Sequence, residues 1–257
     1  MKLKGRTAIV TGSGNGIGRA CAQEFAKEGA AVVVADVNFR GAEETAQLIK
    51  EAGGKALAVE TDVADPASVE QMVRKTVEAF AQIHVLLNNA AVQVNKNIEN
   101  TTFEEWNRQM AVNLGGTFLC SKYCLPFLRQ THGNIVNMAS VNGFFVEPIV
   151  AGYCATKAGI IGFTKAMAID HGKDGIRVNC ICPGYIDSGL AESYFQAQVN
   201  PAEARAAAGK LHALWRIGQP QEVGRVAVFL ASDDASFVTA SSYNVTGGFG
   251  SGIAPLD

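Results

Sequence analysis

The chain has 257 residues, of which 48% are hydrophobic and 18% charged, enough to bury one large core. Its formal net charge of -2 argues against capture of nucleic acid or of an anionic membrane surface. The six cysteines include no C-x-x-C pair and the four histidines form no cluster, so no metal site is expected.

The chain begins with only a short apolar run before glycines, which is neither a signal peptide nor a membrane span. We therefore expect a cytoplasmic protein. Short β-branched runs then alternate with helical patterns along the sequence. In chain order, the expected elements are strand 6–12, helix 16–30, strand 31–36, helix 41–54, strand 55–63, helix 65–80, strand 84–90, helix 102–129, strand 133–140, a helix that holds Tyr153 and runs to His171, strand 176–184, helix 219–232 and strand 241–248.

Strands separated by helices favour right-handed crossovers and a sheet covered on both faces. The pattern predicts an α/β fold with one doubly wound domain over residues 1–257 and a mostly parallel sheet of seven strands. The stretch 186–215 has the least regular pattern. We interpret it as a mobile flap that covers a site.

Glycines fill the junction between the first strand and the first helix, in TGSGNGIG (11–18). Gly12 allows a tight turn, and Gly16 and Gly18 allow close approach of the backbone. The free N–H groups of the following helix suit a pyrophosphate. This placement predicts a dinucleotide site.

Asp36 ends the second strand, at the distance from the glycines where an acid accepts hydrogen bonds from the adenosine ribose. A carboxylate there repels a 2′-phosphate, so NAD is favoured over NADP. Arg40 lies close enough in sequence to receive a phosphate, although a solvated position at the start of a helix is the simpler interpretation. Asp36 as a helix cap is the structural alternative.

Seven motifs in order, TGSGNGIG, Asp62-Val63, NNAA (88–91), Asn113, Ser140, YCATK (153–157) and PGYIDS (183–188), resemble the short-chain dehydrogenase/reductase family over nearly the whole chain. The resemblance implies a Rossmann-type subunit that binds NAD(P). It implies cofactor contacts at Gly12, Ser13, Asn15, Gly16, Ile17, Asp36, Asp62, Val63, Asn88, Asn89, Ala90, Tyr153, Lys157, Pro183, Gly184, Ile186 and Ser188.

Several positions depart from the family pattern. Ala91 stands where glycine is common, Ser188 where threonine is common, and Thr246 where an aspartate often precedes the last glycine pair. Ser188 keeps a hydroxyl, whereas Ala91 narrows the space beside the cofactor. Asn15 stands where relatives that prefer NADP often carry a basic residue, which again favours NAD.

Tyr153 and Lys157 lie one helical turn apart. An unperturbed phenol has a pKa of about 10 and is a poor base at neutral pH. A cation at about 4 Å contributes roughly 4 kcal/mol at an effective dielectric near 20, equal to about three pKa units, although burial of the phenol acts in the opposite direction. Together with a cationic nicotinamide ring, we expect Lys157 to bring the pKa of Tyr153 near 7, where general acid-base catalysis is most effective.

The catalytic residues expected from the family are Asn113, Ser140, Tyr153 and Lys157. Ser140 follows the fifth strand, at the edge where ligands of such sheets bind, and holds the substrate oxygen. The resemblance implies that Lys157 also contacts the nicotinamide ribose and that Asn113 supports a water linked to Lys157. Tyr153 then exchanges a proton while hydride passes between the carbinol carbon and the nicotinamide.

Loops after the fourth, fifth and sixth strands supply the substrate side. We expect contacts from Gln93, Ser140, Asn142, Tyr153 and Tyr185. The other polar or aromatic loop residues are Asn95, Phe144, Phe145, Glu147, Arg205, Lys210, His212 and Arg216. This lining predicts an enzyme of carbohydrate metabolism that interconverts a secondary alcohol and a ketone, or a lactol and a lactone. Its substrate is a small polar molecule such as a sugar, polyol or hydroxy acid.

The helices over 102–129 and 152–171 are apolar around much of their circumference, which predicts a homotetramer or homodimer. Three other functions remain open: an NADP-dependent 3-oxoacyl-carrier-protein reductase, a nucleotide-sugar epimerase or dehydratase, and a non-catalytic NAD-binding scaffold. Asp36 and Asn15 argue against the first. The length of the chain argues against the second, and the presence of both Tyr153 and Lys157 argues against the third.

Overall fold

The computed structural model describes residues 1–251, so the last residues of the expected domain, 252–257, lie outside the described part. One sheet of seven strands runs through it in the order β3-β2-β1-β4-β5-β6-β7. The strands are β1 (Thr7–Thr11), β2 (Ala31–Asp36), β3 (Lys55–Glu60), β4 (Val85–Asn88), β5 (Asn134–Met138), β6 (Arg177–Pro183) and β7 (Ser242–Val245). All six pairings are parallel, where the sequence had indicated a mostly parallel sheet.

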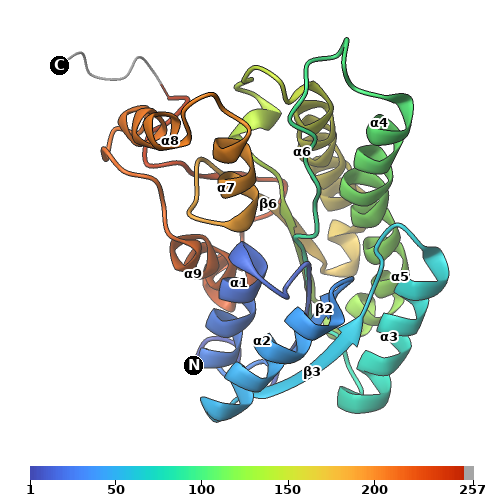
Figure 1. The fold of residues 1–257 in the computed structure, drawn as a ribbon. Coiled ribbons are helices and arrows are strands. Elements are labelled where there is room, and N and C mark those ends of the chain that lie inside the picture. The colour runs from blue at the N-terminus through green and yellow to red at the C-terminus, as the bar shows by residue number, and fades with distance from the viewer. Residues whose placement is uncertain (252–257) are drawn as a thin grey trace.

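Helices cover both faces of this sheet (Figure 1). One face carries α1 (Gly16–Lys27), α2 (Phe39–Glu51) and α9 (Pro220–Ala231). The other carries α3 (Pro66–Phe80), α5 (Gly116–Thr131) and α6 (Ala151–His171). The doubly wound α/β fold is confirmed.

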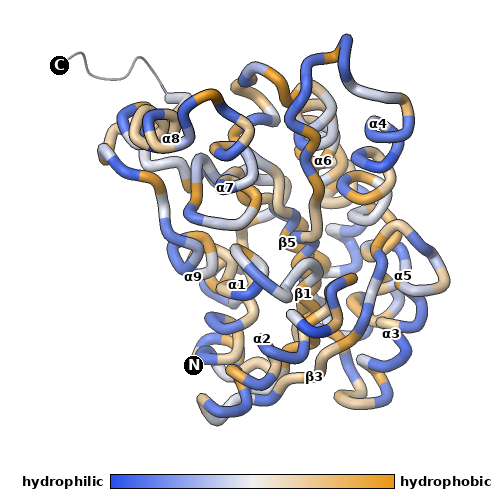
Figure 2. Tube along the Cα trace, viewed as in Figure 1, coloured by the Kyte–Doolittle hydropathy of each residue, from blue (hydrophilic) through white to orange (hydrophobic). Residues whose placement is uncertain are grey.

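The core lies in the strands, because parallel strands between two helical layers must be apolar on both faces. All five residues of β1 are buried. Figure 2 shows β1 and β5 as hydrophobic segments between more polar helices. Two large apolar clusters, one on each face, hold the layers together.

The helix expected over 102–129 is interrupted. It consists of α4 (Phe103–Gln109), a π-helical stretch η1 (Met110–Gly115) and α5. Asn113 lies within this stretch, and its side chain bonds to Val92 and Thr156, which are far away in the sequence. π-helical turns inside α-helices often occur at functional sites.

The stretch 186–215 is also more regular than expected. It forms α7 (Gly189–Gln196) and α8 (Pro201–Lys210). The Ser188 side chain caps α7, and the Asn200 side chain caps α8, whose first residue is Pro201. Its mobility stays a prediction.

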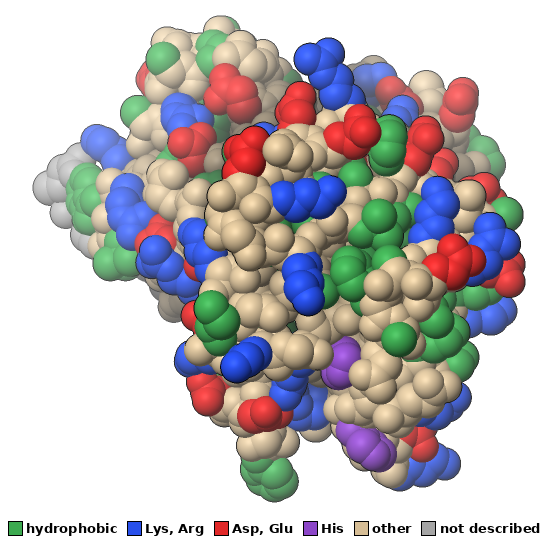
Figure 3. Space-filling view, turned by 90° about the horizontal axis from the view of Figure 1, so that it is seen from below, with side chains coloured by type: hydrophobic (Ala, Val, Ile, Leu, Met, Phe, Trp, Pro, Cys, Tyr) green, Lys and Arg blue, Asp and Glu red, His purple; other side chains and the backbone are tan. Residues whose placement is uncertain are grey.

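The surface, the helices and the side-chain clusters give three further observations. On the face seen in Figure 3, basic and acidic side chains are interspersed. Among residues 1–251, no helix is long and apolar enough to cross a membrane. Within the same residues, no group of three or more His, Cys, Asp or Glu side chains is placed to hold a metal ion.

Candidate active site

A cavity of about 460 Å³ opens at the carboxyl ends of the central strands. Its walls come from the turns after β1, β4, β5 and β6, together with α7. The sheet order places β1 beside β4, so the chain reverses its direction of winding at this point. Open α/β sheets bind ligands at such switch points.

The glycine turn forms one end of this cavity. Gly12 has a φ of +61° and Gly16 a φ of +53°, values that favour glycine. A Cβ on Gly12 would lie 2.7 Å from the Cα of Ala90, so the turn packs directly against the loop after β4. Asn15, Gly16 and Ile17 line the cavity, and no side chain caps the N-terminus of α1. Its free N–H groups therefore suit an anion.

Asp36 lies beside this turn and lines the cavity. Its carboxylate accepts hydrogen bonds from the backbone N–H of Gly14 at 2.8 Å and of Asn38 at 2.9 Å. A Cβ on Gly14 would come within 2.9 Å of this carboxylate, which explains glycine at that position. Asp62 and Val63 line the neighbouring wall.

Two of the expected cofactor residues turn away from the cavity. Ser13 is fully buried and its hydroxyl donates to the Val10 carbonyl at 2.6 Å. Asn88 points into the core and donates to Asn137 and Ser121. Neither lines the cavity, so neither side chain is placed to contact a ligand there.

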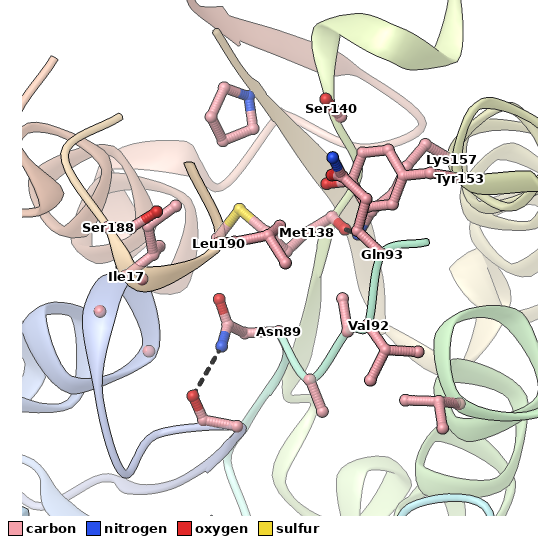
Figure 4. Close-up of a pocket in the computed structure, with 18 of the residues that line it drawn as sticks. Ile17, Asn89, Val92, Gln93, Met138, Ser140, Tyr153, Lys157, Ser188 and Leu190 are labelled. Atoms are coloured by element: carbon pink, nitrogen blue, oxygen red, sulfur yellow. Dashed lines mark hydrogen bonds between the residues drawn. The ribbon is translucent and has the colours of Figure 1, made fainter. Parts of the chain in front are cut away.

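Asn89 and Ala90 do line the cavity (Figure 4). The Asn89 amide donates to the carbonyls of Thr11 and Gly12, at 2.9 and 3.0 Å. Asn89 therefore fixes the carbonyl groups of the glycine turn.

Ser140, Tyr153 and Lys157 lie together at the opposite end (Figure 4). Ser140 follows β5, and its hydroxyl accepts a hydrogen bond from the Asn142 backbone N–H at 3.1 Å. Tyr153 and Lys157 share one face of α6, and the Lys157 ammonium lies 5.3 Å from the centre of the Tyr153 ring. Both side chains are buried, with 7% and 2% of their surface exposed.

The pKa of Tyr153 differs from the expectation. Burial raises the pKa of the phenol well above its ordinary value, and hydrogen bonding with the Ser140 side chain offsets this only in part. The Lys157 ammonium donates to the Met138 carbonyl at 2.7 Å instead of reaching the phenol oxygen. In the protein alone the pKa of Tyr153 therefore lies far from 7, because desolvation dominates. The expected value near 7 depends on Lys157 together with a bound nicotinamide ring and stays a prediction.

Burial also changes the pKa of Lys157, but in the opposite direction. It lowers the pKa of Lys157 from 10.5 to about 8, and the neighbouring thiols of Cys182 and Cys180 oppose this. A desolvated ammonium loses its proton more easily than one in water. At neutral pH the side chain still carries its charge.

Asn113 lies behind the catalytic group and does not line the cavity. Its amide oxygen accepts from the Val92 N–H at 2.8 Å, and its amide nitrogen donates to the Val92 carbonyl at 2.9 Å and to the Thr156 hydroxyl at 3.1 Å. All three bonds join η1 to the loop after β4 and to α6. The side chain is therefore placed to position these segments.

The loop after β6 closes the third side. Pro183, Gly184, Ile186 and Ser188 all line the cavity. The Ser188 hydroxyl accepts from the Ala191 N–H at 3.5 Å and so caps α7. From α7, Leu190 and Tyr194 reach the cavity, which places this helix over it.

All five expected substrate residues, Gln93, Ser140, Asn142, Tyr153 and Tyr185, line the cavity, and so does Glu147. The remaining polar and aromatic loop residues proposed from the sequence do not: Asn95, Phe144, Phe145, Arg205, Lys210, His212 and Arg216. Residues that the sequence did not single out are Val37, Thr61, Ala64, Val92, Arg108, Ala111, Val112, Met138, Ala139, Val141, Gly189, Leu190, Ala191, Tyr194 and Phe249. Gly189, Leu190, Ala191 and Tyr194 fall within the flap expected over 186–215. Most of the others are apolar and carry no motif that could have indicated them.

Known proteins share this arrangement. A family model described as enoyl-(acyl carrier protein) reductase matches residues 12–250. meso-2,3-Butanediol dehydrogenase of Serratia marcescens is 40% identical over 248 residues, which cover 96% of each chain. Cyclohexanol dehydrogenase of Acinetobacter sp. (strain SE19) is 38% identical over 251 residues, again 96% of each chain. A crystal structure of a dehydrogenase/reductase from Sinorhizobium meliloti 1021 superposes with a TM-score of 0.90 at 34% identity, covering 97% of this chain and 96% of that one.

The chain belongs to the short-chain dehydrogenase/reductase family. Its relatives include dehydrogenases named for alcohols, and the chain is an oxidoreductase that acts on alcohol groups and interconverts secondary alcohols and ketones. Enzymes of the short-chain dehydrogenase/reductase family use NAD or NADP. Their substrates are small molecules.

Proposed function

We propose that this protein is an NAD-dependent dehydrogenase whose substrate is a small polar secondary alcohol. One observation carries the proposal: the glycine turn and the group Ser140, Tyr153 and Lys157 line opposite ends of the same cavity. A dinucleotide bound at the turn would extend toward the phenol. Proton and hydride transfer can then occur at one carbon.

Each side chain of the group has a distinct role in the proposal. The Ser140 hydroxyl holds the substrate oxygen beside Tyr153, and the phenol exchanges a proton with it. The Lys157 charge favours the deprotonated phenol, although at a distance and against burial. NAD, when bound, takes up the hydride. Asn113 keeps the loop after β4 and α6 in register behind these groups.

The residues around the glycine turn fit a dinucleotide. The positive φ angles of Gly12 and Gly16 and the uncapped start of α1 leave backbone N–H groups available to a pyrophosphate. Asp62 and Val63 lie on the wall where the adenine would lie. Pro183, Gly184 and Ile186 are placed to contact the nicotinamide end, where Ser188 can add a hydroxyl.

Charge at the turn favours NAD over NADP. A 2′-phosphate on the ribose would meet the Asp36 carboxylate. The two nearby arginines are already engaged: Arg19 donates to the Gly14 carbonyl and to Thr45, and Arg40 pairs with Glu44 at 3.5 Å. Neither is poised to compensate for the phosphate.

We also propose that the subunits assemble into a homotetramer. The outer faces of α5 and α6 expose large apolar side chains, with Phe118 47% and Ile169 79% accessible. Such faces are usually covered by a partner. Light scattering that finds only single subunits at micromolar concentration would contradict this.

The decisive experiment compares the wild-type protein with Tyr153→Phe on a panel of sugars, polyols, hydroxy acids and cyclic alcohols. Absorbance of the reduced cofactor follows turnover with NAD and with NADP. We expect Tyr153→Phe to lose turnover by about 100-fold or more while its affinity for NADH changes little, because only the proton carrier is removed. Tyr243→Phe, which removes a hydroxyl on β7, is the matched control.

Two outcomes would contradict the proposal. If Tyr153→Phe turns over as fast as the control, the phenol carries no proton. If the wild-type protein binds NADH but oxidises or reduces no compound of the panel, the protein is a binding scaffold instead.

A further inference from the structure

One carboxylate lies at the substrate end of the cavity. Glu147, in the segment between η2 (Val141–Gly143) and α6, lines the same cavity as Ser140 and Tyr153. The Tyr185 hydroxyl, from the loop after β6, donates a hydrogen bond to the Glu147 carboxylate. This bond joins two walls of the cavity and fixes the carboxylate between them.

The charge of Glu147 acts on the interior of the site. Burial is the main cause of the raised pKa values of Tyr153, Cys154 and Tyr185, and the Glu147 charge adds to each. An effect on all three groups requires the carboxylate to lie close to them. The catalytic phenol therefore shares its cavity with a negative charge.

Few other charges line this cavity among the described residues: Asp36, Asp62, Arg108 and Lys157. The two aspartates belong to the end with the glycine turn. Arg108 is exposed on α4, and the Lys157 ammonium is buried and bound to the Met138 carbonyl. Glu147 is thus the charged group best placed to meet a substrate.

A neighbouring polar side chain also accepts hydrogen bonds more readily than it donates them. The Gln93 amide nitrogen donates to Asn95 at 2.6 Å, which leaves the Gln93 oxygen as an acceptor. A ligand that brings a hydrogen-bond donor can pair with this oxygen as well as with the Glu147 carboxylate.

We propose that Glu147 determines specificity by accepting a hydrogen bond from a second hydroxyl of the substrate, on the carbon next to the reacting carbinol. The substrate class is then vicinal diols and the matching α-hydroxyketones. Carboxylate or phosphate at that position is repelled, which removes hydroxy acids from the expected substrates. The inference rests on the proposed function, because it assumes oxidation of an alcohol held by Ser140.

The test uses pairs of alcohols that share a carbon skeleton, oxidised with NAD: 2,3-butanediol with 2-butanol, and 1,2-cyclohexanediol with cyclohexanol. In the wild-type protein we expect kcat/KM to favour each diol. In Glu147→Gln, which keeps the size of the side chain but replaces the charged acceptor with a neutral amide oxygen, the diol-to-monoalcohol ratio falls about tenfold, because a hydrogen bond to a charged group is roughly twice as strong as a neutral one. With 3-hydroxybutanoate, kcat/KM rises as the repulsion is removed.

Two further variants sharpen the result. Glu78→Gln removes an exposed charge on α3, away from the cavity, and should leave the ratio unchanged. Glu147→Asp keeps the charge, but its side chain is one methylene shorter, so the carboxylate lies farther from the substrate. It should lower the diol preference while still rejecting the hydroxy acid, and it keeps the test available if Glu147→Gln does not fold.

An unchanged ratio in Glu147→Gln and Glu147→Asp would overturn the inference. Continued oxidation of the monoalcohols would leave the proposed function standing. Failure of the wild-type protein to oxidise any alcohol of either pair would instead refute the proposed function, and the inference with it.

Discussion

Replacing Gly18 with alanine tests the glycine turn directly. A Cβ on Gly18 would lie 2.5 Å from the Asn89 amide nitrogen and 2.8 Å from the Gly12 carbonyl carbon, and closer still to the Gly12 oxygen. The Gly12 backbone cannot move aside for the new Cβ as easily as a flexible side chain could. The turn must shift, and Asn89 must release its bonds to the Thr11 and Gly12 carbonyls.

The expected loss of folding free energy follows from these contacts. Overpacking costs about 1–3 kcal/mol, and two lost hydrogen bonds add about 1 kcal/mol each. Alanine returns about 1 kcal/mol because it favours a helix more than glycine does. The net loss of folding free energy is about 2–4 kcal/mol, or roughly 5–15 °C in Tm for a chain of this length. NADH affinity falls as well, since the turn loses its shape.

Urea unfolding followed by circular dichroism, at one protein concentration, measures the stability, and fluorescence titration measures NADH binding. Gly172→Ala is the control, because Gly172 has helical angles (φ -59°, ψ -36°) and open space around the Cβ position. It should gain about 0.4–1 kcal/mol. A Gly18→Ala protein as stable as this control, with unchanged NADH affinity, would refute the proposed packing of the turn.

Two further predictions concern charge. Asp36→Ala should lower the ratio of kcat/KM with NAD to kcat/KM with NADP by about tenfold or more, mainly through a lower KM for NADP. Glu60→Ala, which removes an exposed carboxylate, is the control. The same ratio in both variants would contradict the role of Asp36. Lys157 has a pKa of about 8 when folded and 10.5 ordinarily, so between these values the unfolded chain binds more protons and the contribution of Lys157 to stability increases with pH. The cost of burying the charged ammonium is fully present below about pH 8 and is lost toward pH 10.5. Lys157→Met removes this cost, so its stability advantage over wild type, measured by urea unfolding, should shrink between these two pH values. A constant difference in stability would show that the Lys157 pKa is not lowered.

The strands could be predicted from the sequence because their signal is local. In β2, a run of β-branched residues between Gly29 and Asp36 leaves few alternatives to a buried strand. The order of motifs likewise places Asp36 at the end of β2, Ser140 just after β5 and Tyr153 on the helix that follows. The order of the strands in the sheet is enough to bring these residues to one cavity, and the details of side-chain packing are not needed to predict this.

What could not be predicted depends on contacts between distant segments. The π-helical stretch η1 exists where Asn113 bonds to Val92 and Thr156, and neither partner is visible in a helical pattern. Asn88 and Asn89 are adjacent and chemically identical, yet one enters the core and the other supports the glycine turn. The family motif cannot separate such neighbours, because only the direction of each side chain differs.

The raised pKa of Tyr153 connects catalysis with the acid at the substrate end. A buried neutral phenol beside Ser140 is a proton donor, which suits reduction of a ketone, whereas oxidation of an alcohol needs the phenol to lose that proton. Lys157 favours the loss because it places a positive charge beside the ring, whereas the negative charge of Glu147 opposes it. Removing the Glu147 charge therefore moves the pH at which oxidation accelerates to a lower value for every alcohol. A diol and its monoalcohol share this shift, so it cancels in their ratio, and any remaining change in the ratio reports on recognition of the second hydroxyl.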